Sequence, residues 1–244
     1  LAIWFIIAIV IVAVIMLLFV FQRKAVIEKK ESFDVQSIIE KCARDSVNEA
    51  VDKMLPPGGF IEPTNYKIYK NIKITYLCQN VGYFKTCINQ HPALLSEMRE
   101  EILSYVNPRI DVCFSNMKIE LEKQNSNVEL GAMNISLSFG TDRIFLNIDR
   151  KVKITKYDET KISDRFKVEI NNPIYDLEKV ASEIANQEAK YCYFEYVGYM
   201  ILYPRFSIDK TALSDSTKIY TIKDRYSNKE INIATRSCAI PPGL

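Results

Sequence analysis

The sequence opens with an uninterrupted apolar segment, Leu1 to Phe21, which contains no charged residue, proline or glycine. As a helix it would extend about 31 Å, which matches the hydrocarbon thickness of a bilayer. A freely soluble cytosolic monomer is thereby excluded, because so many contiguous apolar side chains need lipid or protein around them. We expect this segment to cross a membrane or to fill the core of an assembly.

The apolar segment differs from a cleaved secretory signal peptide. It is about twice as long as the apolar core of a signal peptide, and it leads into Gln22-Arg23-Lys24 with no small-residue cleavage site. Because the sequence opens with Leu rather than Met, we expect the true start to have been removed by processing or to be absent here. The residues expected to form a retained filament-core or membrane helix are Leu1, Ile3, Trp4, Phe5, Ile6, Ile7, Ile9, Val10, Ile11, Val14, Ile15, Leu17, Leu18 and Phe21.

Six cysteines, all outside the apolar segment, indicate the compartment of the rest of the chain. They form no C-x-x-C motif and the chain has one histidine, so the ligands of a zinc site are missing. We expect no metal, and three disulfides formed in an oxidising compartment, although six cysteines allow several other pairings. Cys78 and Cys87 are close enough in sequence for a bond across a hairpin or loop. The expected pairs are Cys42–Cys113, Cys78–Cys87 and Cys192–Cys238.

Opposite charges nearly balance, with 32 Lys and Arg against 30 Asp and Glu and a net charge of +2. This balance gives no electrostatic reason to expect a nucleic-acid partner. The basic residues Arg23, Lys24, Lys29 and Lys30 would place the body of the protein in the cytoplasm by the positive-inside rule. Acidic residues interrupt this cluster, so we give the cysteines more weight and expect an extracellular body.

Apolar residues continue at helical spacing from Val35 to Leu55, with polar residues between them. The pattern predicts an amphipathic helix that ends at Pro56-Pro57-Gly58-Gly59. Either Ser32 or Asp34 would cap a new helix here. Without such a break, the apolar and amphipathic segments form one helix about 80 Å long.

Further along the chain, strand and helix patterns alternate. Residues 66–78 predict a strand, and a helix is expected from Pro92 that ends or bends at Pro108. From Lys118 the apolar spacing changes to two and predicts an antiparallel hairpin around Gly140-Thr141-Asp142, with one buried and one exposed face. The last predicted elements are a strand around 166–170, a helix after Asn172-Pro173, and strands around 192–208, 217–223 and 229–236.

These elements predict an α+β fold. A long hydrophobic and then amphipathic N-terminal helix would lead into an extracellular head of antiparallel β-sheet with two or three packed helices and disulfides. The expected division is residues 1–22 for the apolar helix, 23–117 for the amphipathic helix with a strand and helix region, and 118–244 for the β-rich head.

Few residue patterns point to catalysis. The only histidine, His91, precedes a proline at an expected helix start, so a catalytic triad has no base. The seven glycines form no G-x-S-x-G, P-loop or G-x-G-x-x-G motif. Spacing alone leaves a glycosidase carboxylate pair open, since such groups meet only in the fold. We expect no enzyme activity, no cofactor and no small-molecule substrate.

Two features suggest surface roles. The aromatic segment from Tyr191 to Tyr203 is a candidate sugar- or protein-binding surface, although packing of its rings into a strand explains it as well. Asn134 begins the only N-x-S/T motif and is a candidate glycosylation site if it lies on the exposed strand face. The tyrosines expected on the candidate binding surface are Tyr193, Tyr196, Tyr199 and Tyr203.

The first quarter of the chain resembles a mature archaeal type IV pilin, or class III signal peptide surface protein. The shared pattern is an apolar helix without Met, an amphipathic continuation to about residue 55 and a β-rich body. Phe5 stands where bacterial pilins carry a glutamate, and no acidic residue precedes Glu28, so the archaeal branch is nearer. The rest of the chain, notably the helix that contains Cys42, the turn from Leu55 to Ile61 and the end from Tyr220 to Arg236, resembles uncharacterised archaeal membrane-anchored surface proteins.

Two functions of different classes follow. The resemblance implies a structural subunit of an extracellular type IV pilus-like filament for adhesion or motility, which waits in the membrane and then assembles with copies of itself. The alternative is a single-pass, membrane-anchored cell-surface binding protein that does not polymerise and recognises a glycan, a protein or a pilus component. Lipid-facing and filament-core helices have the same composition, so the sequence does not choose between them.

Overall fold

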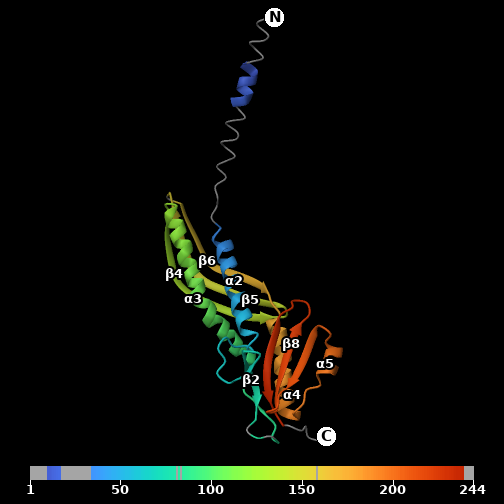
Figure 1. The fold of residues 1–244 in the computed structure, drawn as a ribbon. Helices are drawn as coiled ribbons and strands as arrows, with labels where there is room; N and C mark the ends of the chain where they lie inside the picture. Colours follow the sequence, from blue (N-terminus) through green and yellow to red (C-terminus); the bar gives the residue numbers. More distant parts are fainter. Residues whose placement is uncertain (1–9, 18–33, 81, 83, 158, 239–244) are drawn as a thin grey trace. The chain divides into compact units, whose positions relative to one another are not determined.

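The computed structural model describes residues 10–17, 34–80, 82, 84–157 and 159–238. The chain divides into two compact units, residues 1–35 and 36–244. In the first unit, residues 10–17 form a short helix (Figure 1). The side chains of this helix are exposed. Of the residues described, none belongs to a helix long and apolar enough to cross a membrane. The rest of the predicted apolar helix, residues 1–9 and 18–21, lies outside the described residues.

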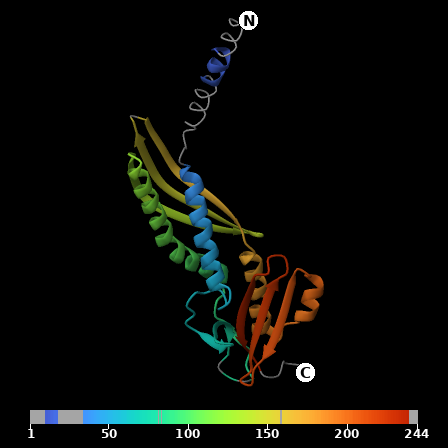
Figure 2. The ribbon, with the colours of Figure 1, turned by 45° about the horizontal axis from the view of Figure 1, so that its top comes forward.

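The second unit confirms the predicted α+β class, with antiparallel sheets and three disulfides. Its described residues form two sheets, one of three strands and one of six. Helices α2 (Val35–Met54) and α3 (Leu94–Lys123) lie along the smaller sheet, as the two ribbon views show (Figures 1 and 2). Helix α4 (Ile174–Tyr191) packs on the larger sheet.

Helix α2 confirms the predicted amphipathic helix. It begins at Val35, directly after Asp34, and ends one residue before Leu55; the other candidate cap, Ser32, lies outside the described residues. Its apolar face is almost completely excluded from water, because the side chains on it are each at most 2% exposed. These residues are Val35, Ile39, Ala43, Val47, Ala50, Val51 and Met54.

Helix α3 corrects two predictions. It begins at Leu94 rather than Pro92, and it continues through Lys118, where the sequence predicted the start of strands. Pro108 lies inside the helix, so of the predicted end or bend at this residue the structure excludes the end. A proline inside a helix costs roughly 3 kcal/mol. Packing outweighs that cost here, because buried residues recur every three or four positions on both sides of the proline. They are Leu94, Met98, Ile102, Val106, Ile110, Phe114, Met117 and Leu121.

The three-stranded sheet confirms the predicted hairpin and the strand after it. Strands β4 (Asn127–Gly140), β5 (Arg143–Lys156) and β6 (Glu159–Asn171) are antiparallel in that order. The β4–β5 turn is the predicted one, and Asp142 adopts a left-handed φ of 57° in it. Register shifts interrupt both ladders near Arg150, so the sheet is locally bulged there.

The six-stranded sheet has the order β1-β2-β9-β8-β7, with β3 paired to β2. The predicted single strand at 66–78 is two strands, because Lys70 and Asn71 both have left-handed φ and make a tight turn. Strands β2 and β9 are parallel, and the other described pairs in this sheet are antiparallel. The strands are β1 (Tyr66–Tyr69), β2 (Ile72–Gln79), β3 (Ile88–Asn89), β7 (Phe206–Ala212), β8 (Thr217–Asp224) and β9 (Glu230–Arg236).

Helix α4 starts as predicted after Asn172-Pro173, where the Asn172 side chain accepts a hydrogen bond from Ile174 N at 3.1 Å. Its apolar stripe is buried against β2, β8 and β9. The helix ends at Tyr191, and the capping residue Cys192 takes a left-handed φ of 55°.

The turn after α2 joins that helix to the larger sheet. The Pro57 carbonyl accepts hydrogen bonds from the Thr75 backbone N–H at 2.9 Å and the Thr75 hydroxyl at 2.6 Å. On the β9 side, the Pro56 carbonyl accepts from Asn232 Nδ2 at 3.1 Å. The turn therefore bridges β2 and β9. Gly58 permits this, because its φ is 93° and a Cβ there would lie 2.7 Å from the Asn232 carbonyl oxygen.

The three disulfides have the predicted pairing. Cys42–Cys113 joins α2 to α3, Cys78–Cys87 closes the loop between β2 and β3, and Cys192–Cys238 joins the end of α4 to the residues after β9. Their Cα–Cα distances are 6.5, 5.4 and 5.5 Å. All lie within the usual range for a disulfide.

One arginine links the two sheets. Arg205 donates to Asp224 on β8 at 2.9 Å, and to Asp142 in the β4–β5 turn at 3.1 Å. Asp176 at the start of α4 lies 3.7 Å away. The hydrogen bond to Asp224 is the main cause of a raised Arg205 pKa, and it outweighs the opposing effect of burial. Asp224 itself is 1% exposed, so this pairing satisfies a buried carboxylate.

We expect the substitution Gly58→Ala to lower the free energy of unfolding by about 1–3 kcal/mol, because alanine disfavours the left-handed φ and its Cβ clashes with Asn232. Urea unfolding of the disulfide-bonded head measures this. The matched control is Gly82→Ala, since a Cβ at Gly82 meets no atom within 4 Å. Equal stabilities for the two variants would contradict the bridging role of the turn.

Candidate functional site

The aromatic segment is helical, which corrects the strand predicted around 192–208. Residues Tyr196–Leu202 form helix α5, and the following strand β7 starts only at Phe206. The Glu195 carboxylate caps the helix by accepting a hydrogen bond from Gly198 N at 3.2 Å. The ring centroids of Tyr199 and Tyr203 lie 4.6 Å apart, as expected for an i, i+4 pair on a helix. Aromatic content suggested a strand, but the three- and four-residue spacing fits a helix.

Two of the predicted tyrosines surround a lysine. The Lys210 Nζ lies 4.8 Å from the ring centroids of both Tyr193 and Tyr196. The Tyr193 hydroxyl donates to Glu195 at 2.5 Å, and this bond is the main reason why the pKa of Glu195 is lowered and that of Tyr193 raised. Burial, with the nearby charge of Lys218, lowers the pKa of Lys210. Sequence reasoning missed Lys210, because it comes from β7 and meets the tyrosines only in the fold.

Of the other two tyrosines, Tyr199 lines an apolar groove of about 460 Å³ beside α5, and Tyr203 packs against Tyr199. The Tyr199 ring lies tilted against the rings of Tyr203 and buried Phe194, and the Phe194 ring centroid is 5.3 Å away. The four tyrosines therefore form two pairs rather than one continuous platform. The groove is lined by Gln187, Phe194, Glu195, Gly198, Tyr199, Ile201 and Leu202.

Exposed aliphatic side chains of α5 line this groove or lie next to it. Ile201 and Leu202 are 76% and 75% exposed, and Val197 is 48% exposed. Exposed Ile and Leu side chains next to aromatic rings are typical of interaction surfaces rather than of catalytic sites. We define the α5 surface as the apolar and aromatic side chains that this helix and its C-cap present at or near the groove: Val197, Tyr199, Ile201, Leu202 and Tyr203.

A buried polar cluster lies near the Cys192–Cys238 disulfide. Glu188 is fully buried and accepts hydrogen bonds from Lys218 Nζ at 2.7 Å and from the Tyr220 hydroxyl at 2.5 Å. Lys218 also donates to the Cys192 carbonyl at 2.6 Å and to Ser237 Oγ at 3.2 Å. Burial, reinforced by the Glu188 charge, raises the pKa of Tyr220.

This cluster contains a serine next to a lysine, a pair that can act in nucleophilic catalysis. Ser237 and Glu188 have no exposed surface, however, and Ser237 also bonds to Glu188. A substrate has no access to such a hydroxyl. The cluster is therefore a structural ion pair whose hydrogen bonds are satisfied inside the protein.

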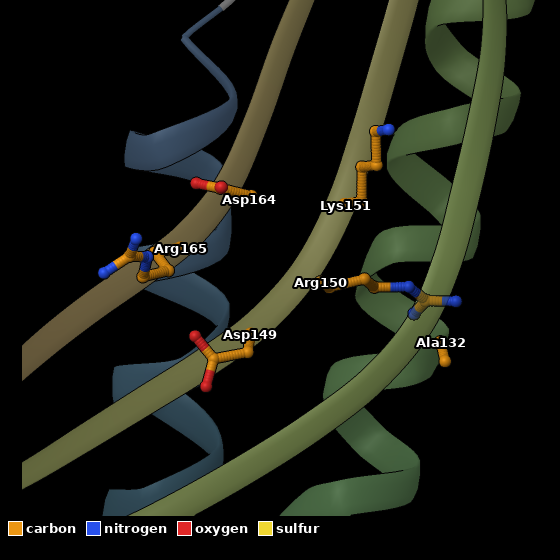
Figure 3. Close-up of a pocket in the computed structure, with 6 residues that line it drawn as sticks. All are labelled: Ala132, Asp149, Arg150, Lys151, Asp164 and Arg165. Carbon is orange, nitrogen blue, oxygen red and sulfur yellow. The ribbon is translucent and has the colours of Figure 1, made fainter.

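Two further grooves lie on the three-stranded sheet. One, of about 310 Å³, follows the bulge near Arg150 and is lined largely by charged residues (Figure 3). Figure 3 shows Asp149 and Arg165 on neighbouring strands, while Arg150 extends past β4 towards α3, where it pairs with Asp111 at 2.7 Å. The second groove, of about 280 Å³, shares Asp149 and Arg165. Its lining residues are Ser136, Asn147, Asp149, Arg165, Phe166 and Lys167.

Candidate metal ligands and bases are sparse. Within the part of the chain that the structure describes, no three His, Cys, Asp or Glu side chains gather to hold a metal ion. His91 Nδ1 lies 2.5 Å from Glu97 Oε2, and its ring packs 4.7 Å from the Phe60 ring centroid. Asn134 is exposed on β4, so it lies on the solvent-facing side of the strand, as a glycosylation site requires.

Comparison with known proteins gives no relative: no family model, curated protein or solved structure matches this chain.

We expect Glu188→Gln to cost about 3–5 kcal/mol of unfolding free energy, because it leaves the Lys218 ammonium without its buried carboxylate. Chemical denaturation of wild type and variant measures the loss. The control Glu183→Gln removes an exposed carboxylate from the same helix and should change stability by less than about 0.5 kcal/mol. Similar small losses for both would show that the buried cluster does not stabilise the head.

The stability of the head should also depend on Tyr199 at high pH. Burial, with the charges of Tyr203 and Glu183, raises the Tyr199 pKa to about 12. The neutral hydroxyl is thus favoured in the folded state. The stabilisation of the folded state by the protonated Tyr199 hydroxyl is complete below about pH 10, the ordinary pKa of tyrosine in the unfolded chain. It is lost as the pH rises towards the Tyr199 pKa of the folded state. Between about pH 9 and 11.5, unfolding free energy should fall more steeply for wild type than for Tyr199→Phe.

The matched control for this pH profile is Tyr157→Phe, because the Tyr157 ring is 81% exposed. This variant should follow the wild-type slope. A Tyr199→Phe profile parallel to the wild-type profile would contradict the assigned burial of the Tyr199 hydroxyl.

Proposed function

We propose that this protein is a structural subunit of an extracellular pilus-like filament that assembles through its apolar segment, Leu1 to Phe21. The observation that carries the proposal is the attachment of α2. This helix follows the apolar segment in sequence, its apolar face is buried in the head, and Cys42–Cys113 ties it to α3. A filament subunit requires a head that stays folded next to the apolar segment in sequence, and the burial and disulfide of α2 support this.

The apolar segment needs a partner. In the helix at residues 10–17 the large apolar side chains are between 49% and 66% exposed. Covering on the order of a thousand Å² of such surface, at about 25 cal/mol per Å², gives a gross gain of tens of kcal/mol before entropy is subtracted. Lipid tails supply this cover before assembly, and copies of the same segment supply it in a filament.

The three disulfides support an extracellular location for the head. Such bonds persist in oxidising compartments and are rare in reducing ones. They also limit unfolding of a head exposed outside the cell, because they restrict the unfolded chain.

The α5 surface favours a second candidate function. Its Ile201 and Leu202 are three-quarters exposed beside an apolar groove, which suits recognition of another molecule. On this alternative the protein stays in the membrane by one helix and binds a surface partner without polymerising.

The filament proposal predicts that Val14→Asp abolishes assembly and leaves the head folded. A carboxylate in an apolar filament core is costly, whereas the head does not depend on this side chain. Electron microscopy of material sheared from the cell surface counts the filaments, and non-reducing gels confirm the disulfides of the head. Val14→Leu is the control and should assemble normally. Filaments of normal number and length from Val14→Asp would overturn the proposal.

A second variant distinguishes the two proposed functions. In this variant residues 1–21 keep their composition, but their order is shuffled. A bilayer requires only apolar length, so a membrane-anchored binding protein should be unaffected. A filament core depends on side-chain packing between copies and should lose assembly. Recovery of wild-type chain only in detergent-extracted membranes would favour the membrane-anchored alternative.

A further inference from the structure

Asn134 and Ser136 lie on the same exposed face of strand β4. The strand alternates, so that both side chains point to solvent while Leu137 is buried on the other face. Strand β4 is also an edge strand, paired only with β5 among the described strands. The two polar groups of the Asn134-Ile135-Ser136 motif are therefore accessible from the same side.

The Asn134 side-chain amide is not engaged in a hydrogen bond with any described residue. Neither it nor the Ser136 hydroxyl forms a side-chain hydrogen bond with any described residue, whereas other surface asparagines, such as Asn65 and Asn89, do. Its register partner on β5 is Asp149, and that of Ser136 is Asn147. Attachment of a group to the Asn134 amide would therefore disrupt no side-chain hydrogen bond to the described residues.

The surface next to Asn134 suits a sugar. Ser136, Asn147, Asp149 and Arg165 line the groove of about 280 Å³ beside it, together with Phe166 and Lys167. Hydroxyl, amide, carboxylate and guanidinium groups can all hydrogen-bond to sugar hydroxyls. A first sugar on Asn134 would therefore lie against polar groups rather than against apolar surface.

We propose that Asn134 is the acceptor of an N-linked glycan, transferred from a lipid-phosphate-linked oligosaccharide. The Asn134 amide nitrogen forms a bond to the anomeric carbon of the first sugar and loses a proton. The bond between that carbon and the donor phosphate breaks, and the lipid phosphate leaves with the electron pair. The inference rests on the extracellular location in the proposed function, because the donor and the disulfides both require export.

Peptide mass spectrometry of the full chain, purified from the organism that encodes it, tests this inference. The peptide that contains Asn134 should carry a mass increase that fragments in sugar-sized steps. Asn134→Gln and Ser136→Ala should each abolish the modification. Ser136→Thr retains the motif and should preserve it, and Ser138→Ala, on the same exposed strand face, is the matched control that should also preserve it.

Two outcomes would overturn the inference. An unmodified Asn134 peptide does so directly, and a glycan that survives in Asn134→Gln would be attached to another residue. Alkylation of the same sample separates this failure from that of the proposed function. Fully oxidised cysteines with unmodified Asn134 would refute the glycan alone, whereas reduced cysteines would refute the extracellular location as well.

Discussion

The turn at residues 55–59 makes the helices and the larger sheet one folding unit. Its carbonyls accept hydrogen bonds from Thr75 and Asn232, which belong to strands far apart in sequence. The parallel ladder between β2 and β9 runs from Tyr76 to Gln79, so the turn continues the pairing where that ladder begins. Because α2 ends in this turn, the position of the helix follows from the position of the sheet.

Two ionic groups then fix the remaining parts. Arg205 connects the β4–β5 turn with β8 and α4, and Lys218 with Glu188 connects β8 with the end of α4. Both groups contain an almost completely buried carboxylate, so loss of either pairing would leave a buried charge without its partner. These hydrogen-bonded ion pairs fix the orientation of the elements they join, whereas the apolar contacts of the core are not directional.

Regular apolar spacing predicted a large part of the fold. Helix α2 and the β4–β5 hairpin repeat their pattern over many residues, so local sequence is sufficient to define them. Helix α3 was not predicted in full, because a local rule about Pro108 is overridden by burial on the smaller sheet. The turn at Lys70 was missed, since neither of its left-handed residues is glycine.

The candidate site shows the same limit. The sequence identified the tyrosines of the aromatic segment, but their grouping into two pairs depends on Lys210 from β7 and on helix α5. The buried cluster around Glu188 left no local signal, because its members come from α4, β8 and the residues after β9. Such contacts are set by tertiary structure rather than by periodicity.

The Cys42–Cys113 bond has a mechanical consequence. A tension applied from the N-terminal side can straighten α2 only as far as Cys42, because the chain beyond that point is bypassed by the covalent link to α3. The bond spans 71 residues of sequence, which include the rest of α2 and strands β1 to β3. This stretch would bear no tension while force passed directly into α3 at Cys113, so the bond shields the rest of α2 and strands β1 to β3 from mechanical unfolding.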